Sequence, residues 1–381
     1  MVTKDFTKQP KKDKDKIMKL TVSRSLLSDA LRKVQSLASG KHSMPILSNV
    51  KIEAKGDKAK FTTTDLDMSV VVEISCSVSE EGAVTLPAKL MSDAIARAAE
   101  GDVLIEVDDA TNKAVIRAGS SVFRLSGLPA AEFPKLPDVD ADATSFKIPQ
   151  EVLKTLFRRT AYAMSNDDTR RILRGVHVKY SDGFLTLAAT DGRRLAVAEY
   201  HPEESFTFEM EYTLPEKAIV ELIRHLGSTG DISFAQGKTQ MVATLDSGIV
   251  IYSKLLDDAY PNYAAVIPQD NKIEIVVDRN LLIGAIERVG IFSEANSMKF
   301  DIGNGMIRLS SSTDSGDSDE PVPVKYTGET IKASFNHGYI LDALKALDDD
   351  EVVFKFKDGQ SPVSVSCSTP GIAVIMPLRI N

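Results

Sequence analysis

The chain repeats one arrangement of helix, strand and turn three times, and this repetition limits its fold more than any other feature. A Thr-Asp pair ends an apolar strand in each copy, with aspartates at Asp65, Asp191 and Asp314, separated by 126 and 123 residues. A period of about 125 residues is a domain length and far exceeds the roughly 20–50 residues of a solenoid repeat. The helical stretch before each pair carries a leucine at the same place: Leu27, Leu153 and Leu282.

Each copy combines two stretches of helical periodicity with several alternating strands. This pattern predicts an α+β fold, with two helices and antiparallel sheets in every copy. We therefore predict three tandem similar domains, at 18–143, 144–270 and 271–381, after a flexible charged leader, 1–17. The helices are expected within 23–38, 88–99, 150–164, 215–226, 279–290 and 336–347.

Composition argues against several classes of protein. The longest apolar run, 371–378, is much shorter than the roughly 18 residues that span a bilayer, and the N-terminal residues lack the apolar core of a secretory signal. We therefore expect a cytoplasmic protein that does not bind membranes. The two cysteines, Cys76 and Cys367, lie in alternating apolar contexts and predict small packed side chains rather than a disulfide. The five histidines are scattered, so neither a metal site nor a cofactor is expected.

Positive charge is concentrated in the predicted helices. The whole chain has a formal net charge of −8, yet the six helical stretches contain 13 Lys and Arg against 7 Asp and Glu. A weakly basic helical face on an acidic molecule favours loose, sequence-independent attraction to a polyanion such as DNA. The helices carry no aromatic platform for stacking bases, which also favours sliding over tight binding. This charge argument selects Arg24, Arg32, Arg158, Arg159 and Arg224 as candidates that face DNA.

A row of three sheet-bearing domains leaves an unpaired strand at each end. Such edges invite association, and identical chains joined head to tail would close them. The residues alone do not decide between two chains and three. The candidates for this seam are Phe123, Leu125, Ile291 and Phe292.

The segment Asp191-Gly192 predicts a two-residue hairpin turn, and it is followed at once by Arg193 and Arg194. Taken alone, this is a solvated hairpin tip. The repeated Thr-Asp pairs leave open an enzyme whose aspartates act as general bases between domains, although an Asp in a turn ordinarily caps that turn. A scaffold that does not bind DNA is a third alternative. The chain contains no phosphate loop, no H-E-x-x-H helix and no G-x-S-x-G elbow.

Several short motifs, together with the threefold repetition, give a specific resemblance. From Met18 to Asn381 the chain resembles the family of the bacterial DNA polymerase III beta subunit, the sliding clamps. The motifs are "MPILSN" at 44–49, "TTTDLDMSV" at 62–70, "GLPAAEFPKLP" at 127–137, "ATDGRRLA" at 189–196, "YPNYAAVIP" at 260–268 and the terminal "VIMPLRIN".

The resemblance implies a non-catalytic subunit of DNA polymerase III that forms a homodimeric, six-domain ring. The helices of such a ring line the hole and the sheets lie outside. The implied partners are double-stranded DNA, bound without sequence preference, the DNA polymerase III catalytic subunit, an ATP-driven clamp loader, and other replication and repair proteins with a clamp-binding motif.

The resemblance also assigns residues. It places Lys41 and Lys217 near DNA and supports the four seam residues. In the partner-peptide pocket, Arg194 is expected to form a wall, with its stem packed and its head in water. The chain departs from the family at Ala265, where a second pocket arginine is common, and in the loop 165–173, where some members place tyrosines. The implied pocket residues are Leu173, Thr190, Gly192, Arg194, Leu195, Pro261, Val266, Val374, Met376, Pro377 and Leu378.

Overall fold

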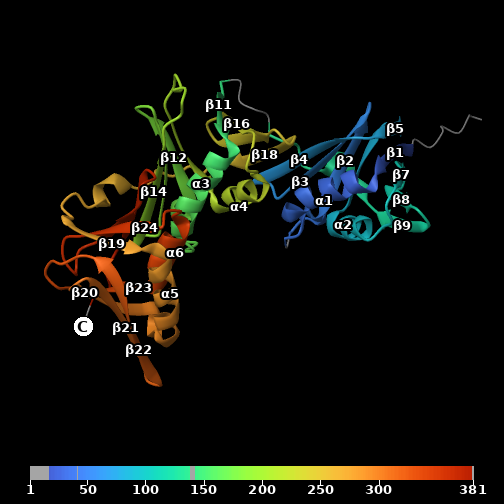
Figure 1. Cartoon of the computed structure of the whole chain (residues 1–381). Helices are drawn as coiled ribbons and strands as arrows, with labels where there is room; N and C mark the ends of the chain where they lie inside the picture. Colours follow the sequence, from blue (N-terminus) through green and yellow to red (C-terminus); the bar gives the residue numbers. More distant parts are fainter. Residues whose placement is uncertain (1–16, 41, 138–141, 380–381) are drawn as a thin grey trace, which may run out of the picture. The chain divides into compact units, whose positions relative to one another are not determined.

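The computed structural model describes residues 17–40, 42–137 and 142–379 (Figure 1). These residues pack into two compact units. The first holds the described residues up to Ser145 together with Ile232–Ser253, and the second holds Phe146–Asp231 and the residues from Lys254 onward. The predicted leader, 1–17, lies outside the described residues apart from Ile17, which begins the first strand.

The first unit contains two antiparallel sheets and two helices. Helix α1 (Arg24–Ala38) packs on one of the sheets and on α2 (Ala88–Ala96). One sheet has the order β5 (Ser77–Glu80), β1 (Ile17–Ser23), β7 (Asp102–Asp108), β8 (Lys113–Ala118), β9 (Ser121–Ser126). The other has the order β10 (Leu128–Pro129), β6 (Gly82–Pro87), β2 (Asn49–Lys55), β3 (Lys58–Thr64), β4 (Met68–Ser75), β18 (Ile249–Lys254), β17 (Gln240–Leu245), β16 (Asp231–Gln236), β11 (Thr144–Pro149).

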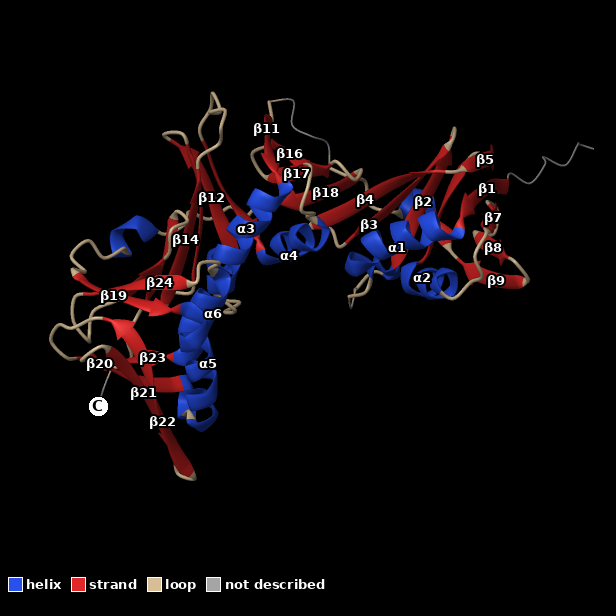
Figure 2. Ribbon diagram, in the orientation of Figure 1, coloured by secondary structure: helices blue, strands red, loops and turns tan. Residues whose placement is uncertain are grey.

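The second unit is built on one twelve-stranded antiparallel sheet. Figure 2 shows its helices beside the strands, with α5 alongside β21 and β22. The helices are α3 (Gln150–Thr160), α4 (Glu216–His225), α5 (Arg279–Val289) and α6 (His337–Ala346). The strands follow the order β15 (Met210–Pro215), β12 (Gly175–Ser181), β13 (Phe184–Thr190), β14 (Arg194–Tyr200), β26 (Gly371–Ile375), β25 (Val363–Ser366), β24 (Glu351–Phe356), β19 (Ile273–Asp278), β22 (Gly316–Lys325), β21 (Met306–Thr313), β20 (Ser297–Gly303), β23 (Ile331–Asn336).

The helices form where the sequence supplies both a cap and an apolar face. The Ser23 hydroxyl accepts a hydrogen bond from the Leu26 amide at the start of α1, and the Asp278 carboxylate accepts one from Leu281 at the start of α5. In α1 the buried side chains recur at helical spacing, so one face enters the core. All six predicted helical stretches contain a helix, which confirms the α+β prediction.

The first and third copies share a buried hydrogen bond that ties helix to sheet. The Thr63 hydroxyl of β3 donates to the Val34 carbonyl of α1 at 2.5 Å, and the Ser311 hydroxyl of β21 donates to the Val289 carbonyl of α5 at 2.6 Å. Val289 is the last residue of α5, where carbonyls lack intrahelical partners, whereas Val34 lies one turn before the end of α1. The same polar link in both copies shows that the domains resemble one another in detail, beyond element order.

Successive copies join through paired strands. In the first unit β4 pairs with β18, with Val70 opposite Ile251, and in the second unit β14 pairs with β26, with Leu195 opposite Val374. Strands β16, β17 and β18 of the middle copy consequently belong to the first unit, while its helices belong to the second. Three similar domains are therefore distributed over two compact units.

Two details of the sequence analysis are refined by the structure. The hairpin at Asp191 is not a two-residue turn, because β13 ends at Thr190 and β14 begins at Arg194, which leaves three residues in the connection. Cys76 and Cys367 are free thiols, as expected, but both are only partly buried. No helix in the described part of the chain is long and apolar enough to cross a membrane.

Candidate functional site

The connection between β13 and β14 is held by its own aspartate. The Asp191 carboxylate accepts hydrogen bonds from the backbone amides of Arg193 and Arg194, at 2.8 and 3.0 Å. Gly192 has a φ of 84°, a left-handed conformation that glycine adopts without strain. The Thr190 hydroxyl accepts from the Gly192 amide and donates to the Arg194 carbonyl. Asp191 therefore acts as a turn cap.

Asp65 has the same role in the first copy. Its carboxylate accepts from the amides of Asp67 and Met68, at 3.1 and 2.8 Å. Two of the three repeated aspartates thus accept hydrogen bonds from backbone amides and cap turns. This structural role argues against the alternative in which they act as general bases. Within the described residues, no group of His, Cys, Asp and Glu could hold a metal ion.

Arg194 is the polar centre of this region, and its head is not in water as the sequence analysis expected. Its side chain is only 10% exposed. The guanidinium donates to Asp191 at 3.0 Å and to Asp342 of α6 at 2.5 Å, and it lies 4.4 Å from the centre of the Tyr339 ring. These contacts join the β13–β14 hairpin to α6. The arginine therefore holds the hairpin of the candidate pocket in place against α6.

The C-terminal segment is fixed beside the same hairpin. After β26 the Met376 amide donates to the Arg193 carbonyl at 3.0 Å, and the Leu378 amide donates to the Ser334 carbonyl at 2.7 Å. Both side chains nevertheless stay open to solvent, with exposed fractions of 47% for Met376 and 37% for Leu378. Pro377 lies between them. An ordered chain end that presents apolar side chains outward is a suitable wall for a bound peptide.

A small apolar cluster lies under this wall. Leu195 and Val374 are buried and face one another across the β14–β26 pair. Tyr263 and Ile267, which the sequence analysis did not select, pack against them, while Val266 and Pro261 are exposed. Leu173 is buried in the short 3-10 turn Arg171–Arg174. The turn Tyr263–Val266 holds the missed tyrosine, and its place within the "YPNYAAVIP" motif was the signal that could have revealed it.

Tyr260 connects this cluster to the strand behind it. Its hydroxyl accepts a hydrogen bond from the Thr190 amide at 3.1 Å, and its ring stacks on His177 with 4.7 Å between ring centres. Burial lowers the pKa of His177, although the nearby Glu211 carboxylate acts in the opposite direction. The imidazole is therefore neutral at neutral pH, which suits a ring that stacks on the half-buried Tyr260. Sequence reasoning missed both residues because their contact joins positions far apart in the chain.

The loop 165–173 packs against the hairpin. Arg170 donates to the Asp191 carbonyl at 2.9 Å, and it also bonds to the Asp167 carboxylate at 3.1 Å. Arg171 is exposed. The loop thus helps to hold the candidate pocket in place through Arg170.

The candidate DNA-facing arginines are mostly engaged within the chain. Arg24 pairs with Glu100 at 2.7 Å, Arg32 with Asp29 at 2.6 Å, Arg158 with Asp348 at 2.5 Å and Arg224 with Glu221 at 2.9 Å. The Arg158 guanidinium holds the pKa of Asp348 below its ordinary value. Lys217 is exposed at the start of α4, and Lys41 lies outside the described residues. The helical positive charge is consequently weaker than the residue count suggested.

The structure corrects the prediction that Arg159 faces DNA. It is 6% exposed, and its guanidinium donates to the carbonyls of Pro370 and Thr369, at 3.0 and 3.2 Å. A buried side chain that satisfies backbone carbonyls cannot contact a phosphate, so we remove it from the DNA-facing set. The sequence did not show this because the carbonyl partners lie about two hundred residues further along the chain.

The seam candidates lie on strands or turns with unpaired neighbours. Strand β9 ends its sheet and alternates half-buried Phe123 and Leu125 with exposed Arg124. Ile291 and Phe292 lie in the short turn Gly290–Phe292 and are 77% and 37% exposed. Close to them, β22 pairs with β21 along its length but with β19 only at its last two residues. Each candidate therefore borders a free stretch of sheet edge.

Comparison with known proteins places these features in one family. Models of the DNA polymerase III beta subunit match throughout the chain: the N-terminal domain at 18–137, the central domain at 147–262 and the C-terminal domain at 264–379. The beta sliding clamp of Chlamydia pneumoniae is 32% identical over 367 residues, covering 96% of this chain and all of that one. The beta sliding clamp of Caulobacter vibrioides is 33% identical over 373 residues, covering 95% of this chain and all of its own.

Solved structures of sliding clamps are also similar to this chain. A Caulobacter crescentus beta sliding clamp superposes with a TM-score of 0.91 at 32% identity, covering 96% of this chain and all of that one. A sliding clamp from Pseudomonas aeruginosa bound to griselimycin gives 0.89 at 30% identity, covering 95% and 100% of the two chains. The likeness covers all three copies of the repeat.

Replacing Arg194 by Met should destabilise the hairpin, because the carboxylates of Asp191 and Asp342 lose their shared cation. We expect R194M to lower the free energy of unfolding by about 1–3 kcal/mol, measured by urea titration. The matched control is R193M, since Arg193 is an exposed neighbour whose loss should change stability by less than about 0.5 kcal/mol. Equal midpoints for the two variants would show that Arg194 does not organise this region.

Proposed function

The chain belongs to the family of the bacterial DNA polymerase III beta subunit, and from this membership we propose that two copies close head to tail into a ring around duplex DNA. The chain acts as a DNA sliding clamp for the polymerase and is not itself an enzyme. The ring would tether the DNA polymerase III catalytic subunit, a separate clamp loader would place it on DNA, and other motif-bearing proteins would share the same surface. We propose domain boundaries at 18–143, 144–270 and 271–381.

The edges support the head-to-tail arrangement. Strand β9 and the free part of β22 are unpaired in one chain, and unpaired edges favour addition of another strand. Their charges are opposite, since β9 exposes Arg124 whereas β22 carries Asp317, Asp319 and Glu320. Apolar Phe123, Leu125, Ile291 and Phe292 would lie at the centre of the contact. A closed ring needs such a heterologous contact to repeat until no edge is left.

The charge state of the helices supports enclosure of DNA over tight binding. Four of the candidate arginines already pair with carboxylates, so few cations remain to neutralise phosphates. Affinity for DNA that depends on phosphate neutralisation should therefore be low. Retention on DNA would come from the topological link, and the weak helical charge would let the duplex move through.

The candidate pocket supports capture of short linear motifs. Its floor is the buried pair Leu195 and Val374, and its rim is formed by exposed Met376, Leu378 and Val266. Flexible Met and Leu side chains can adapt to varied apolar anchors. Fixed polar groups in the hairpin can set the direction of a peptide. Ala265 leaves one side of this surface less polar than in many family members, so the preferred motifs should rely on apolar anchors.

A circular DNA should retain the protein and a cut circle should release it. After loading by a clamp loader onto a nicked plasmid, we expect the protein to coelute with DNA on gel filtration and to leave it after linearisation. A linear DNA whose ends are blocked by bound proteins is the control and should retain the clamp. Equal retention on linear DNA with free ends would contradict a topological link.

Removing residues 376–381 should abolish capture of a polymerase-derived clamp-binding peptide and leave the dimer intact. The single substitution M376A should weaken binding by about tenfold, because an apolar side chain of this size contributes about 1.5 kcal/mol or more when buried. Fluorescence anisotropy measures both effects. M306A is the matched control, since Met306 is equally exposed on β21. Unchanged binding by the truncated chain would show that the pocket lies elsewhere.

Replacing both Ile291 and Phe292 by Asp should yield monomers, because two charges would enter an apolar contact. We expect light scattering to give a mass near 41.5 kDa for the double variant and twice that value for the unaltered chain. L281D is the control, since Leu281 is also exposed but lies on α5 outside the seam. A double variant of unchanged mass would refute this seam.

A further inference from the structure

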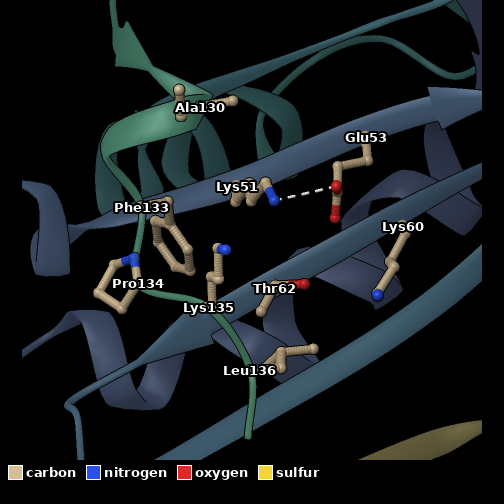
Figure 3. A pocket seen from close by; sticks show the side chains of 10 residues that line it. Lys51, Glu53, Lys60, Thr62, Ala130, Phe133, Pro134, Lys135 and Leu136 are labelled. Atoms are coloured by element: carbon tan, nitrogen blue, oxygen red, sulfur yellow. Dashed lines mark ion pairs between the residues drawn. The ribbon is translucent and has the colours of Figure 1, made fainter. Parts of the chain in front are cut away.

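A second candidate site lies in the first unit, on the sheet surface of the first copy. A cavity of about 320 Å³ opens between β2, β3 and the segment that follows β10 (Figure 3). Four side chains form its floor. In the register of the two strands, Lys51 lies opposite Thr62 and Glu53 lies opposite Lys60. The wall is formed by Phe133, Pro134, Lys135 and Leu136.

The wall is fixed in place by packing. Phe133 is 5% exposed and packs with Ile46, Leu47 and Leu128 in a small apolar cluster. The turn Ala130–Glu132 leads directly into it. The cavity is therefore preformed, which reduces the entropy lost when a ligand binds.

Positive charge is in excess around the cavity. Lys51, Lys60 and Lys135 line it, against one carboxylate, Glu53. Glu53 pairs with Lys51 at 2.9 Å. On the other side of Lys60, the Glu73 carboxylate pairs with Lys58 at 2.7 Å. Among the described residues Lys60 and Lys135 have no ion-pair partner, so two ammonium groups remain for a ligand.

Thr62 supplies an independent sign of a missing partner. It is 2% exposed, and its hydroxyl has no hydrogen-bond partner in the described structure. The next two threonines of the same strand are satisfied: Thr63 donates to the Val34 carbonyl and Thr64 donates to the Met68 carbonyl. Buried hydroxyls are ordinarily bonded, because leaving one unpaired costs free energy. Figure 3 shows Thr62 on the cavity floor between Lys135 and Lys60.

The middle copy fills the corresponding position. Lys51 corresponds to His177, 126 residues later, and Phe133-Pro134 corresponds to Tyr260-Pro261. In the middle copy the Tyr260 ring stacks on His177 at 4.7 Å and occupies that surface. In the first copy the aromatic ring packs on Ile46 and Leu47 instead, and lysine replaces the imidazole. The first and the middle copy thus differ in what covers this strand surface.

We infer that this cavity binds a short acidic peptide of a partner protein, with a carboxylate between Lys60 and Lys135 and an apolar neighbour against Leu136. The hydroxyl of Thr62 would donate to the same carboxylate. Charge-assisted hydrogen bonds from two lysines and a hydroxyl suit a carboxylate. A nucleic-acid strand fits less well, because Glu53 lies in the site and the walls are apolar. The site is separate from the peptide surface at the C-terminal segment.

The test uses the full chain and a labelled peptide that alternates glutamate with leucine, titrated by fluorescence anisotropy. We expect the acidic peptide to bind at least about tenfold more tightly than the same peptide in which glutamine replaces each glutamate. The double variant K60Q/K135Q should remove this preference. The control K58Q should keep it, because the Lys58 ammonium pairs with the Glu73 carboxylate and does not line the cavity. Equal binding of the two peptides, or an unaltered K60Q/K135Q, would overturn the proposal.

T62V separates ligand binding from packing. We expect about threefold weaker peptide binding with an unchanged or raised thermal midpoint, because valine removes only an unsatisfied hydroxyl. A lowered midpoint with unchanged peptide affinity would assign Thr62 a structural role and contradict the inference. Inorganic phosphate that competes as well as the acidic peptide would identify a phosphate site and also contradict it. Binding should persist after removal of residues 376–381, and its loss would place the peptide at the C-terminal surface instead.

Discussion

Backbone pairing between the strands of successive copies is the constraint on which the rest of the structure depends. Each copy presents an edge strand that must find a partner, and β4–β18 and β14–β26 supply one inside each unit. The second pairing also sets the candidate pocket, because it brings Leu195 of the middle copy opposite Val374 of the last. The position of these two side chains at the candidate pocket thus follows from the strand register. Strand β9 and part of β22 are among the sheet edges that stay open in the described residues, and in the proposed ring a second chain would join there.

Arg194 connects the middle and last copies through polar contacts, in addition to the backbone pairing. One guanidinium serves Asp191 of the hairpin and Asp342 of α6, and the Tyr339 ring covers it. Because its charge is already satisfied within the chain, Arg194 holds the hairpin in place, and in the proposed function the exposed rim would supply the contact area. Apolar rim residues can then change between relatives without loss of the frame. The Thr190–Arg194 segment therefore links the β13–β14 hairpin to α6 of the last copy.

The sequence predicted the elements well and their polar partners poorly. Helices such as α1 were predictable because apolar spacing and the Ser23 cap are local signals. The environments of Arg158 and Arg159 were not, since their partners, Asp348 and the carbonyl of Pro370, are about two hundred residues away. The pocket residues were selected through family resemblance, whereas the seam residues were selected from the unpaired sheet edges and only supported by the resemblance. Tyr263 and Ile267 were missed because their role depends on which strands come together.

The differences between the copies carry more functional information than their similarities. A shared frame makes each copy a control for the others, so a departure at one position points to selection for something other than folding. The middle copy covers its strand surface with the Tyr260–His177 stack, whereas the first copy leaves lysines and the unsatisfied Thr62 hydroxyl around a cavity. An unsatisfied buried hydroxyl lowers stability, and a valine would fold as well in a strand. Its presence beside lysines that have no ion-pair partner among the described residues is what the inferred ligand would account for.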